Sequence, residues 1–179
     1  AFARAMREGR NKYTTTAGLP ALREAIAKGW DAYAPGLTED NVCITMSGTN
    51  ALMNLFLTLL DPGRKVLLPE PYFPLYGPDA TLVGGSATYY PCRFEHEFVP
   101  QIEDLEALVD EDTVAILYNF PSNPTGGTIN AAQRDALLIA IRDRAMRESK
   151  QRGHDVLTFV SARDTATQQC ERTVSYTHL

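Results

Sequence analysis

Residues 113–128 read Thr-Val-Ala-Ile-Leu-Tyr-Asn-Phe-Pro-Ser-Asn-Pro-Thr-Gly-Gly-Thr, an apolar run followed by a loop rich in proline, asparagine and glycine. The run 113–118 predicts a buried strand, which the loop cannot continue as sheet. Ligands of open α/β folds bind at such carboxyl ends of strands. The Asn123 amide can donate as well as accept a hydrogen bond, and Pro124 restricts its backbone. The pattern indicates either a polar amide held at the mouth of a pocket or an ordinary strand-exit turn.

A second stretch predicts a strand, a tight turn and a helix. Residues 41–46 predict a short buried strand, which runs into a stretch with helical spacing over 47–60. At a helix start, free backbone N–H groups and the positive end of the helix dipole favour an anion. Ser47 and Thr49 add hydroxyl donors, and Gly48 allows close backbone approach. The alternative is a plain helix cap.

Between these stretches, residues 65–76 read Lys-Val-Leu-Leu-Pro-Glu-Pro-Tyr-Phe-Pro-Leu-Tyr. We expect a strand from Lys65 to Leu68, with Lys65 as an exposed edge charge, and then a loop that three prolines restrict. Phe73 offers a flat aromatic face in this loop, with Tyr72 as its near neighbour. The alternative is that Phe73 and Tyr76 are core aromatics.

The rest of the chain alternates between strand and helix. Pro20 suits the first turn of a helix, residues 86–92 predict a strand, Pro100 opens a helix, and residues 130–150 predict another helix. The fold class expected is α/β, a mostly parallel sheet with helices on both faces.

These motifs resemble those of the pyridoxal-phosphate-dependent aminotransferases of fold type I, class I/II, the aspartate aminotransferase-like family. Asn-Pro-Thr-Gly at 123–126 is similar to the family signature, Ser-Gly-Thr-x-Ala-Leu at 47–52 to its phosphate-binding turn, and Pro-Tyr-Phe-Pro at 71–74 to its aromatic segment. Residues 13–23, Tyr…Gly-Leu-Pro-x-Leu-Arg, resemble a fourth segment. The motifs keep the family's order over about residues 2–141.

The resemblance implies a pyridoxal 5′-phosphate site and a role for each matching residue. The family's tyrosine at the position of Tyr13 reaches the phosphate of the neighbouring subunit, which implies a homodimer. The implied cofactor-binding residues are Ser47, Gly48 and Thr49 at the phosphate, Phe73 stacked on the pyridine ring, Asn123 donating to the 3′-oxygen, and Tyr13 across the dimer.

The chain also departs from the family, which implies a truncated member. The family's Ser-x-x-Lys segment, with its Schiff-base lysine, lies beyond this point, so we assign no catalytic residue. Neither Asp155 nor Asp164 matches the aspartate that pairs with the pyridine nitrogen. We expect residues 1–143 to be a partial cofactor-binding large domain and residues 144–179 to be an out-of-frame or disordered extension.

The function implied is transfer of an amino group between an L-amino acid and a 2-oxo acid, with the chain itself inactive. Three alternatives stay open. In the first, the intact protein is another fold type I pyridoxal enzyme, such as a carbon–sulfur lyase or a cyclopropane-carboxylate synthase. In the second, it is an aminotransferase-like ligand-sensing domain of a transcription regulator. The third alternative is an α/β domain without a cofactor.

Composition and charge argue against other functional classes of protein. The formal charge of −5 without a basic stripe argues against nucleic-acid binding, and no apolar stretch is long enough to span a membrane. No metal-ligand pattern is visible. Three widely spaced cysteines indicate no disulfide framework and a reducing cytoplasm. Cys43, inside the expected strand, is interpreted as a core residue, and the histidines as surface residues.

Overall fold

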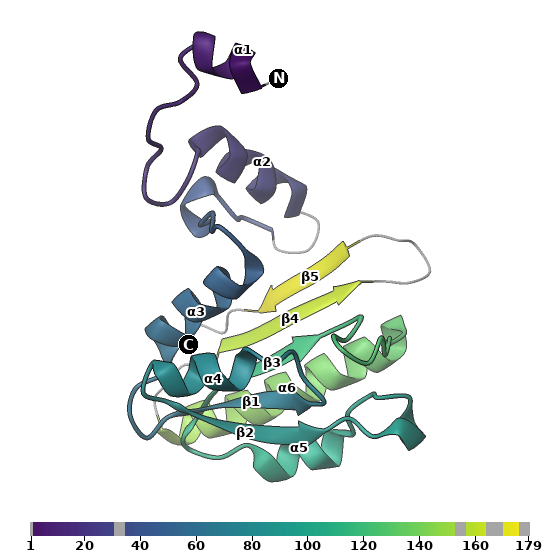
Figure 1. Ribbon diagram of the computed structural model, residues 1–179. Coiled ribbons are helices and arrows are strands. Elements are labelled where there is room, and N and C mark those ends of the chain that lie inside the picture. The colour runs from purple at the N-terminus through teal and green to yellow at the C-terminus, as the bar shows by residue number, and fades with distance from the viewer. Residues whose placement is uncertain (1, 31–34, 153–156, 164–169, 176–179) are drawn as a thin grey trace. The chain divides into compact units, whose positions relative to one another are not determined.

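The computed structural model describes residues 2–30, 35–152, 157–163 and 170–175 (Figure 1). The chain divides into two compact units, Ala1–Gly48 and Thr49–Leu179. The first unit contains the helices α1 (Phe2–Arg7) and α2 (Pro20–Trp30) and the 3-10 helix η1 (Glu39–Asn41). The second contains a five-stranded sheet and its covering helices.

In the first unit, one arginine of α2 holds the segment that follows η1. Arg23 donates from Nε to the carbonyl oxygen of Val42 at 2.8 Å and also pairs with Asp40 at 3.3 Å. The backbone N–H of Ile44 donates to the carbonyl oxygen of Ala17 at 2.9 Å. These contacts give the Val42 carbonyl and the Ile44 N–H hydrogen-bond partners without a neighbouring strand.

The strand predicted over residues 41–46 is therefore wrong. Asn41 ends η1, and the residues after it are assigned no strand. The interpretation of Cys43 as a core residue fails with it, because the Cys43 side chain is exposed. An apolar run forms a strand only when a neighbouring strand accepts its backbone hydrogen bonds, and the sheet includes none in this segment.

The sheet of the second unit has the strand order β2-β1-β3-β4-β5. The strands β2, β1, β3 and β4 are parallel to one another, and β5 runs antiparallel to β4. The bounds are β1 Lys65–Glu70, β2 Ser86–Pro91, β3 Thr113–Asn119, β4 Leu157–Arg163 and β5 Cys170–Ser175.

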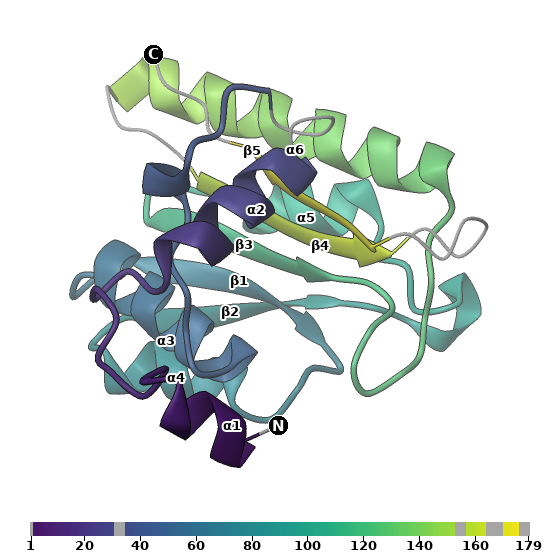
Figure 2. The same cartoon turned by 90° about the horizontal axis from the view of Figure 1, so that it is seen from above.

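Helices cover both faces of this sheet. The bounds are α3 Gly48–Leu59, α4 Tyr76–Leu82, α5 Ile102–Leu108 and α6 Ala131–Arg152, with a 3-10 helix, η2, at Phe94–His96. Figure 2 shows α3 and α4 on one side of the strands and α5 and α6 on the other. The predicted fold class, a mostly parallel sheet with helices on both faces, is confirmed.

Alternate side chains of the central strands fill two separate cores. Val66 and Leu68 pack with Phe56 of α3 on one face, while Leu67 and Ile116 pack beneath α5 and α6 on the other. Strands buried on both faces have continuous rather than alternating apolar sequences. For this reason the runs at 65–68 and 113–118 were recognisable as strands.

Local signals place the helix starts correctly. Asn130 caps α6: its side-chain oxygen accepts from the backbone N–H of Gln133, and the Gln133 side chain accepts from the backbone N–H of Asn130, both at 2.9 Å. This reciprocal pair satisfies two donors that a helix start otherwise leaves unpaired. The predicted helix over 130–150 is confirmed.

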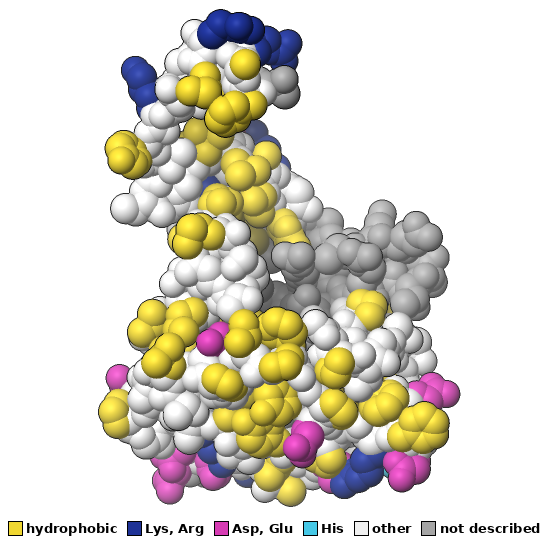
Figure 3. Space-filling model, in the orientation of Figure 1, with side chains coloured by type: hydrophobic (Ala, Val, Ile, Leu, Met, Phe, Trp, Pro, Cys, Tyr) yellow, Lys and Arg dark blue, Asp and Glu magenta, His cyan; other side chains and the backbone are white. Residues whose placement is uncertain are grey.

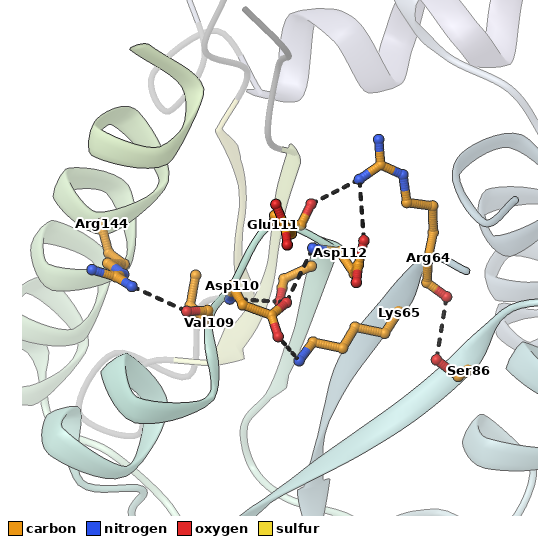
Figure 4. Close-up of polar contacts among 9 residues, drawn as sticks. Arg64, Lys65, Ser86, Val109, Asp110, Glu111, Asp112 and Arg144 are labelled. Atoms are coloured by element: carbon orange, nitrogen blue, oxygen red, sulfur yellow. Dashed lines mark hydrogen bonds and ion pairs between the residues drawn. The ribbon is translucent and has the colours of Figure 1, made fainter. Parts of the chain in front are cut away.

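The expectation that Lys65 is an exposed edge charge is wrong. Lys65 enters β1, which lies inside the sheet between β2 and β3. Its ammonium group lies 2.7 Å from Oδ2 of Asp110, and its side chain is 15% exposed (Figure 4). The Asp110 carboxylate also accepts from the backbone N–H of Asp112 and the hydroxyl of Thr113, each at 3.1 Å.

Residues 144–179 carry the end of α6 together with β4 and β5. Arg144, the first residue of the expected extension, donates to the carbonyl oxygen of Val109 at 3.1 Å (Figure 4). The domain boundary at residue 143 stays a prediction. Asp155, Asp164, His154 and His178 lie outside the described residues, and His96 is exposed as expected.

Across the part of the chain that the structure describes, no helix is long and apolar enough to cross a membrane. Exposed leucines lie on or next to α3 and α4, namely Leu57, Leu75 and Leu82. Figure 3 shows hydrophobic side chains spread over one face of the second unit.

Candidate functional site

The order of the strands places a topological switch point at the carboxyl ends of β1 and β3, which lie at the same edge of the sheet. From β1 the chain passes through α4 to β2 on one side of β1, and from β2 it returns through α5 to β3 on the other side. Tyr76 and Ala80 of α4, which follows β1, pack on one face, and Leu137 and Ile141 of α6, which follows β3, pack on the opposite face. The loops that follow β1 and β3 therefore diverge. Open α/β sheets bind ligands at this kind of topological switch point.

The loop after β1 carries Phe73 to this edge. Phe73 is half-buried, and its ring lies 5.5 Å from that of Tyr76, tilted by 59°. Tyr76, the first residue of α4, is buried in the core between that helix, α3 and the sheet, so the core alternative holds for Tyr76. Phe73 keeps part of its surface open, as a ring that stacks on a ligand must.

The loop after β3 carries Asn123 to the same edge, because β1 and β3 are parallel neighbours. Two backbone hydrogen bonds of 2.8 Å close this loop, from the N–H of Ser122 to Gly127 and from the N–H of Gly126 to Ser122. Gly126 has a φ of +73°, a conformation that side chains disfavour. Asn123 is exposed at the turn, and its amide makes no hydrogen bond to a described residue.

The start of α3 points toward this edge of the second unit. A Cβ on Gly85, which precedes β2, would lie 2.8 Å from Cβ of Leu60, so α3 ends beside the amino ends of the strands. Its beginning, with Thr49 half-buried, therefore lies toward their carboxyl ends. Ser47 and Gly48 belong to the first unit and are exposed, and nothing lies within 4 Å of a Cβ built on Gly48.

Tyr13 is fully exposed in the loop between α1 and α2 of the first unit. It makes no contact that would fix its ring within the described chain. A side chain that contacts a ligand in a partner subunit is expected to be exposed in the isolated chain. The role of Tyr13 stays a prediction.

The described residues supply no evident nucleophile near the carboxyl ends of β1 and β3. Cys92, just beyond β2, is buried, and burial raises the pKa of its thiol to about 11, so it stays protonated at neutral pH. No group of three metal-ligating side chains occurs among the described residues. The arrangement is suited to holding a ligand through an amide, an aromatic face and a helix start.

Two residues that pack against Tyr72, the residue before Phe73, were missed by the sequence reasoning. Tyr89 of β2 stacks on Tyr72, and Gly77 of α4 lies against the Tyr89 hydroxyl. The sequence offered no local signal for this contact, because Tyr72 and Tyr89 are 17 residues apart.

A mostly parallel sheet with helices on both faces and a switch point between β1 and β3 defines an open α/β fold. The family model of aminotransferase class I and II matches residues 1–146. The chain therefore belongs to the aminotransferase class I and II family.

Similar proteins agree with this assignment. The aspartate aminotransferase of Thermotoga maritima is 37% identical over 124 residues, covering 69% of this chain and 33% of that protein. A single mutant of the Thermus thermophilus aspartate aminotransferase matches with a TM-score of 0.74 at 27% identity, covering 90% of this chain and 47% of the other. For an alanine aminotransferase from Pyrococcus furiosus the TM-score is 0.75 at 27% identity, covering 90% and 46%. The chain spans about a third of the length of the curated relatives it matches.

Proposed function

We propose that this chain is the cofactor-binding part of a pyridoxal-phosphate-dependent aminotransferase. The intact enzyme would move an amino group between an L-amino acid and a 2-oxo acid. The observation that carries the proposal is the switch point between β1 and β3, which has Phe73 on one loop and Asn123 on the other. The exposed Asn123 side chain and the part of the Phe73 ring that stays accessible support the proposal, because a phosphorylated pyridine needs both surfaces free.

Each proposed residue has a physical task. Thr49, with Ser47 and Gly48, would bind the phosphate through backbone N–H groups and hydroxyls at the start of α3. Phe73 would stack on the pyridine ring with an offset face. Asn123 would donate a hydrogen bond to the ring's 3′-oxygen and stabilise negative charge there.

Bound pyridoxal phosphate supplies an electron sink for the charge left when a substrate loses its α-proton. The residues of this chain contribute binding and orientation to that chemistry. No lysine of the chain (Lys12, Lys28, Lys65 or Lys150) lies in a Ser-x-x-Lys segment, so the chain as it stands would be inactive.

The proposed enzyme is a cytoplasmic homodimer. Support comes from the fully exposed Tyr13 and from the exposed leucines Leu57 and Leu82, since exposed apolar surface often marks an interface. The proposed boundary of the large domain at residue 143 is close to residue 146, where the family model ends.

The Asn123 amide provides the most direct test of this function. Pyridoxal 5′-phosphate is titrated into the 179-residue chain, its Asn123→Asp variant and a Thr128→Ala variant, and the dissociation constants are measured by equilibrium dialysis. Asn123→Asp keeps the shape of the side chain but replaces an N–H donor by a negatively charged acceptor. A hydrogen bond to a charged group is worth about 1.5–3 kcal/mol, so we expect a loss of at least about tenfold.

Thr128 is exposed in the same loop and serves as the matched control, with unchanged affinity expected. Two results would contradict the proposal. One is a wild-type chain that shows no saturable binding. The other is an Asn123→Asp variant that binds as tightly as the control.

A further inference from the structure

Two tyrosines from different elements form a pair beside Phe73. Tyr72 follows β1 and Tyr89 lies in β2. Their rings are stacked, with centroids 5.0 Å apart and planes 24° apart, and the Tyr72 hydroxyl donates to the Tyr89 hydroxyl at 3.5 Å. That hydrogen bond is long and therefore weak. The stacked rings provide most of the attraction.

The position of Tyr89 depends on a glycine in α4. Gly77 is buried, and a Cβ built there would overlap Oη of Tyr89 while lying 3.6 Å from its Cζ, an ordinary contact distance. The same Cβ would lie 3.5 Å from the Tyr72 hydroxyl. Only the terminal oxygen of Tyr89 therefore requires glycine at position 77.

The pair connects directly to the proposed stacking residue. Tyr72 precedes Phe73, whose carbonyl oxygen accepts from the backbone N–H of Tyr76 at 3.1 Å. The hydrogen bond with Tyr72, and then burial, raise the pKa of Tyr89 to about 12, so its hydroxyl stays protonated at neutral pH. The loop is thus held at Tyr72 by β2 and at Phe73 by α4.

We propose that Tyr72, Tyr89 and Gly77 are positioning residues that hold the Phe73 ring at the orientation in which it stacks on the cofactor's pyridine. This inference rests on the proposed function. The three residues act through Phe73, and none of them needs to touch the cofactor.

The geometry makes a test with an internal control possible. Gly77→Ala should displace the Tyr89 hydroxyl and break the stack, whereas Tyr89→Phe removes the overlapping oxygen and keeps the ring. The double variant Gly77→Ala/Tyr89→Phe therefore carries the same alanine without the overlap. For each protein, two quantities are measured in the 179-residue chain: hydrogen exchange of the Tyr76 amide, and the dissociation constant for pyridoxal 5′-phosphate.

We expect Gly77→Ala to speed exchange at Tyr76 and to weaken cofactor binding, each by about twofold to tenfold, as loss of one aromatic pair implies. Tyr89→Phe alone should change either quantity less than twofold. The double variant should return both toward wild type.

Each other outcome overturns part of the account. Faster exchange in Gly77→Ala with unchanged affinity would make the pair purely structural and refute the positioning role. A double variant as impaired as Gly77→Ala would refute the role of the Tyr89 hydroxyl. If the wild-type chain does not bind the cofactor, the proposed function fails and the positioning role with it, while the exchange data still show whether the tyrosine pair holds the loop.

Discussion

At the scale of single residues, the ion pair of Lys65 and Asp110 shows how a long-range contact changes the behaviour of a side chain. Partial burial alone would raise the pKa of Asp110. Hydrogen bonds from Lys65, from the Asp112 backbone and from Thr113 outweigh it and hold that pKa below its ordinary value of 3.8. The pair closes the amino ends of β1 and β3, opposite the candidate site.

Asp110→Asn should destabilise the chain at neutral pH by no more than about 1 kcal/mol, because the Asp110 side chain is about half exposed. A lowered folded-state pKa contributes stability that is present above pH 3.8 and lost as pH falls through the folded value. The difference between wild type and variant should therefore shrink below about pH 3.8. Urea unfolding at pH 7 and at pH 2.5 measures it.

Asp112→Asn is the matched control. The Asp112 carboxylate lies 3.8 Å from the Arg64 guanidinium, so its removal should lower the free energy of unfolding less than Asp110→Asn does. If the stability difference for Asp110→Asn stayed constant between the two pH values, the ion pair would not be its cause.

The same scale separates what the sequence predicted from what it missed. The Asn123 loop was located correctly at a strand end, because proline and glycine act on their immediate neighbours. The predictions that Lys65 is an exposed edge charge and that Cys43 is a core residue were wrong. The partner of Lys65 is 45 residues away along the chain, and no neighbouring strand covers Cys43, which is exposed. The pattern around a residue does not reveal partners so far along the chain.

At the scale of elements, periodicity located β1, β3, α3 and α6 to within about two residues. It failed at 41–46, where an apolar run without a pairing strand stays irregular. The switch point between β1 and β3 was also outside its reach. That feature depends on the order of the strands in space, which the order along the chain does not determine.

The loop after β1 illustrates the same limit within one element. Its aromatic residues were evident from sequence, and Phe73 was selected among them by resemblance. The Tyr72 and Tyr89 pair required coordinates, because β2 contributes the second ring. Local sequence thus identified the loop, and tertiary packing buries Tyr76 while Tyr72 and Phe73 stay half-buried.

At the scale of the whole molecule, the chain spans about a third of its curated relatives, and this limits the activity expected of it. We predict no transamination by the 179-residue chain above the rate of pyridoxal 5′-phosphate alone, because no lysine of the proposed kind is present to hold the cofactor covalently. The assay follows conversion of an amino acid and a 2-oxo acid, with the intact Thermotoga maritima aspartate aminotransferase as positive control. Turnover that rises in proportion to the chain's concentration would contradict this prediction.

The central claim is that one edge of the second unit cradles a phosphorylated pyridine. The measurement that tests it most directly is a titration of the ¹⁵N-labelled chain with pyridoxal 5′-phosphate, followed by NMR at the Thr49 backbone amide, the Phe73 backbone amide and the Asn123 side-chain amide. The account predicts that all three signals shift along one saturation curve with one dissociation constant, whereas inorganic phosphate shifts Thr49 alone. Signals that saturate with different constants, or an Asn123 amide that does not respond, would contradict it.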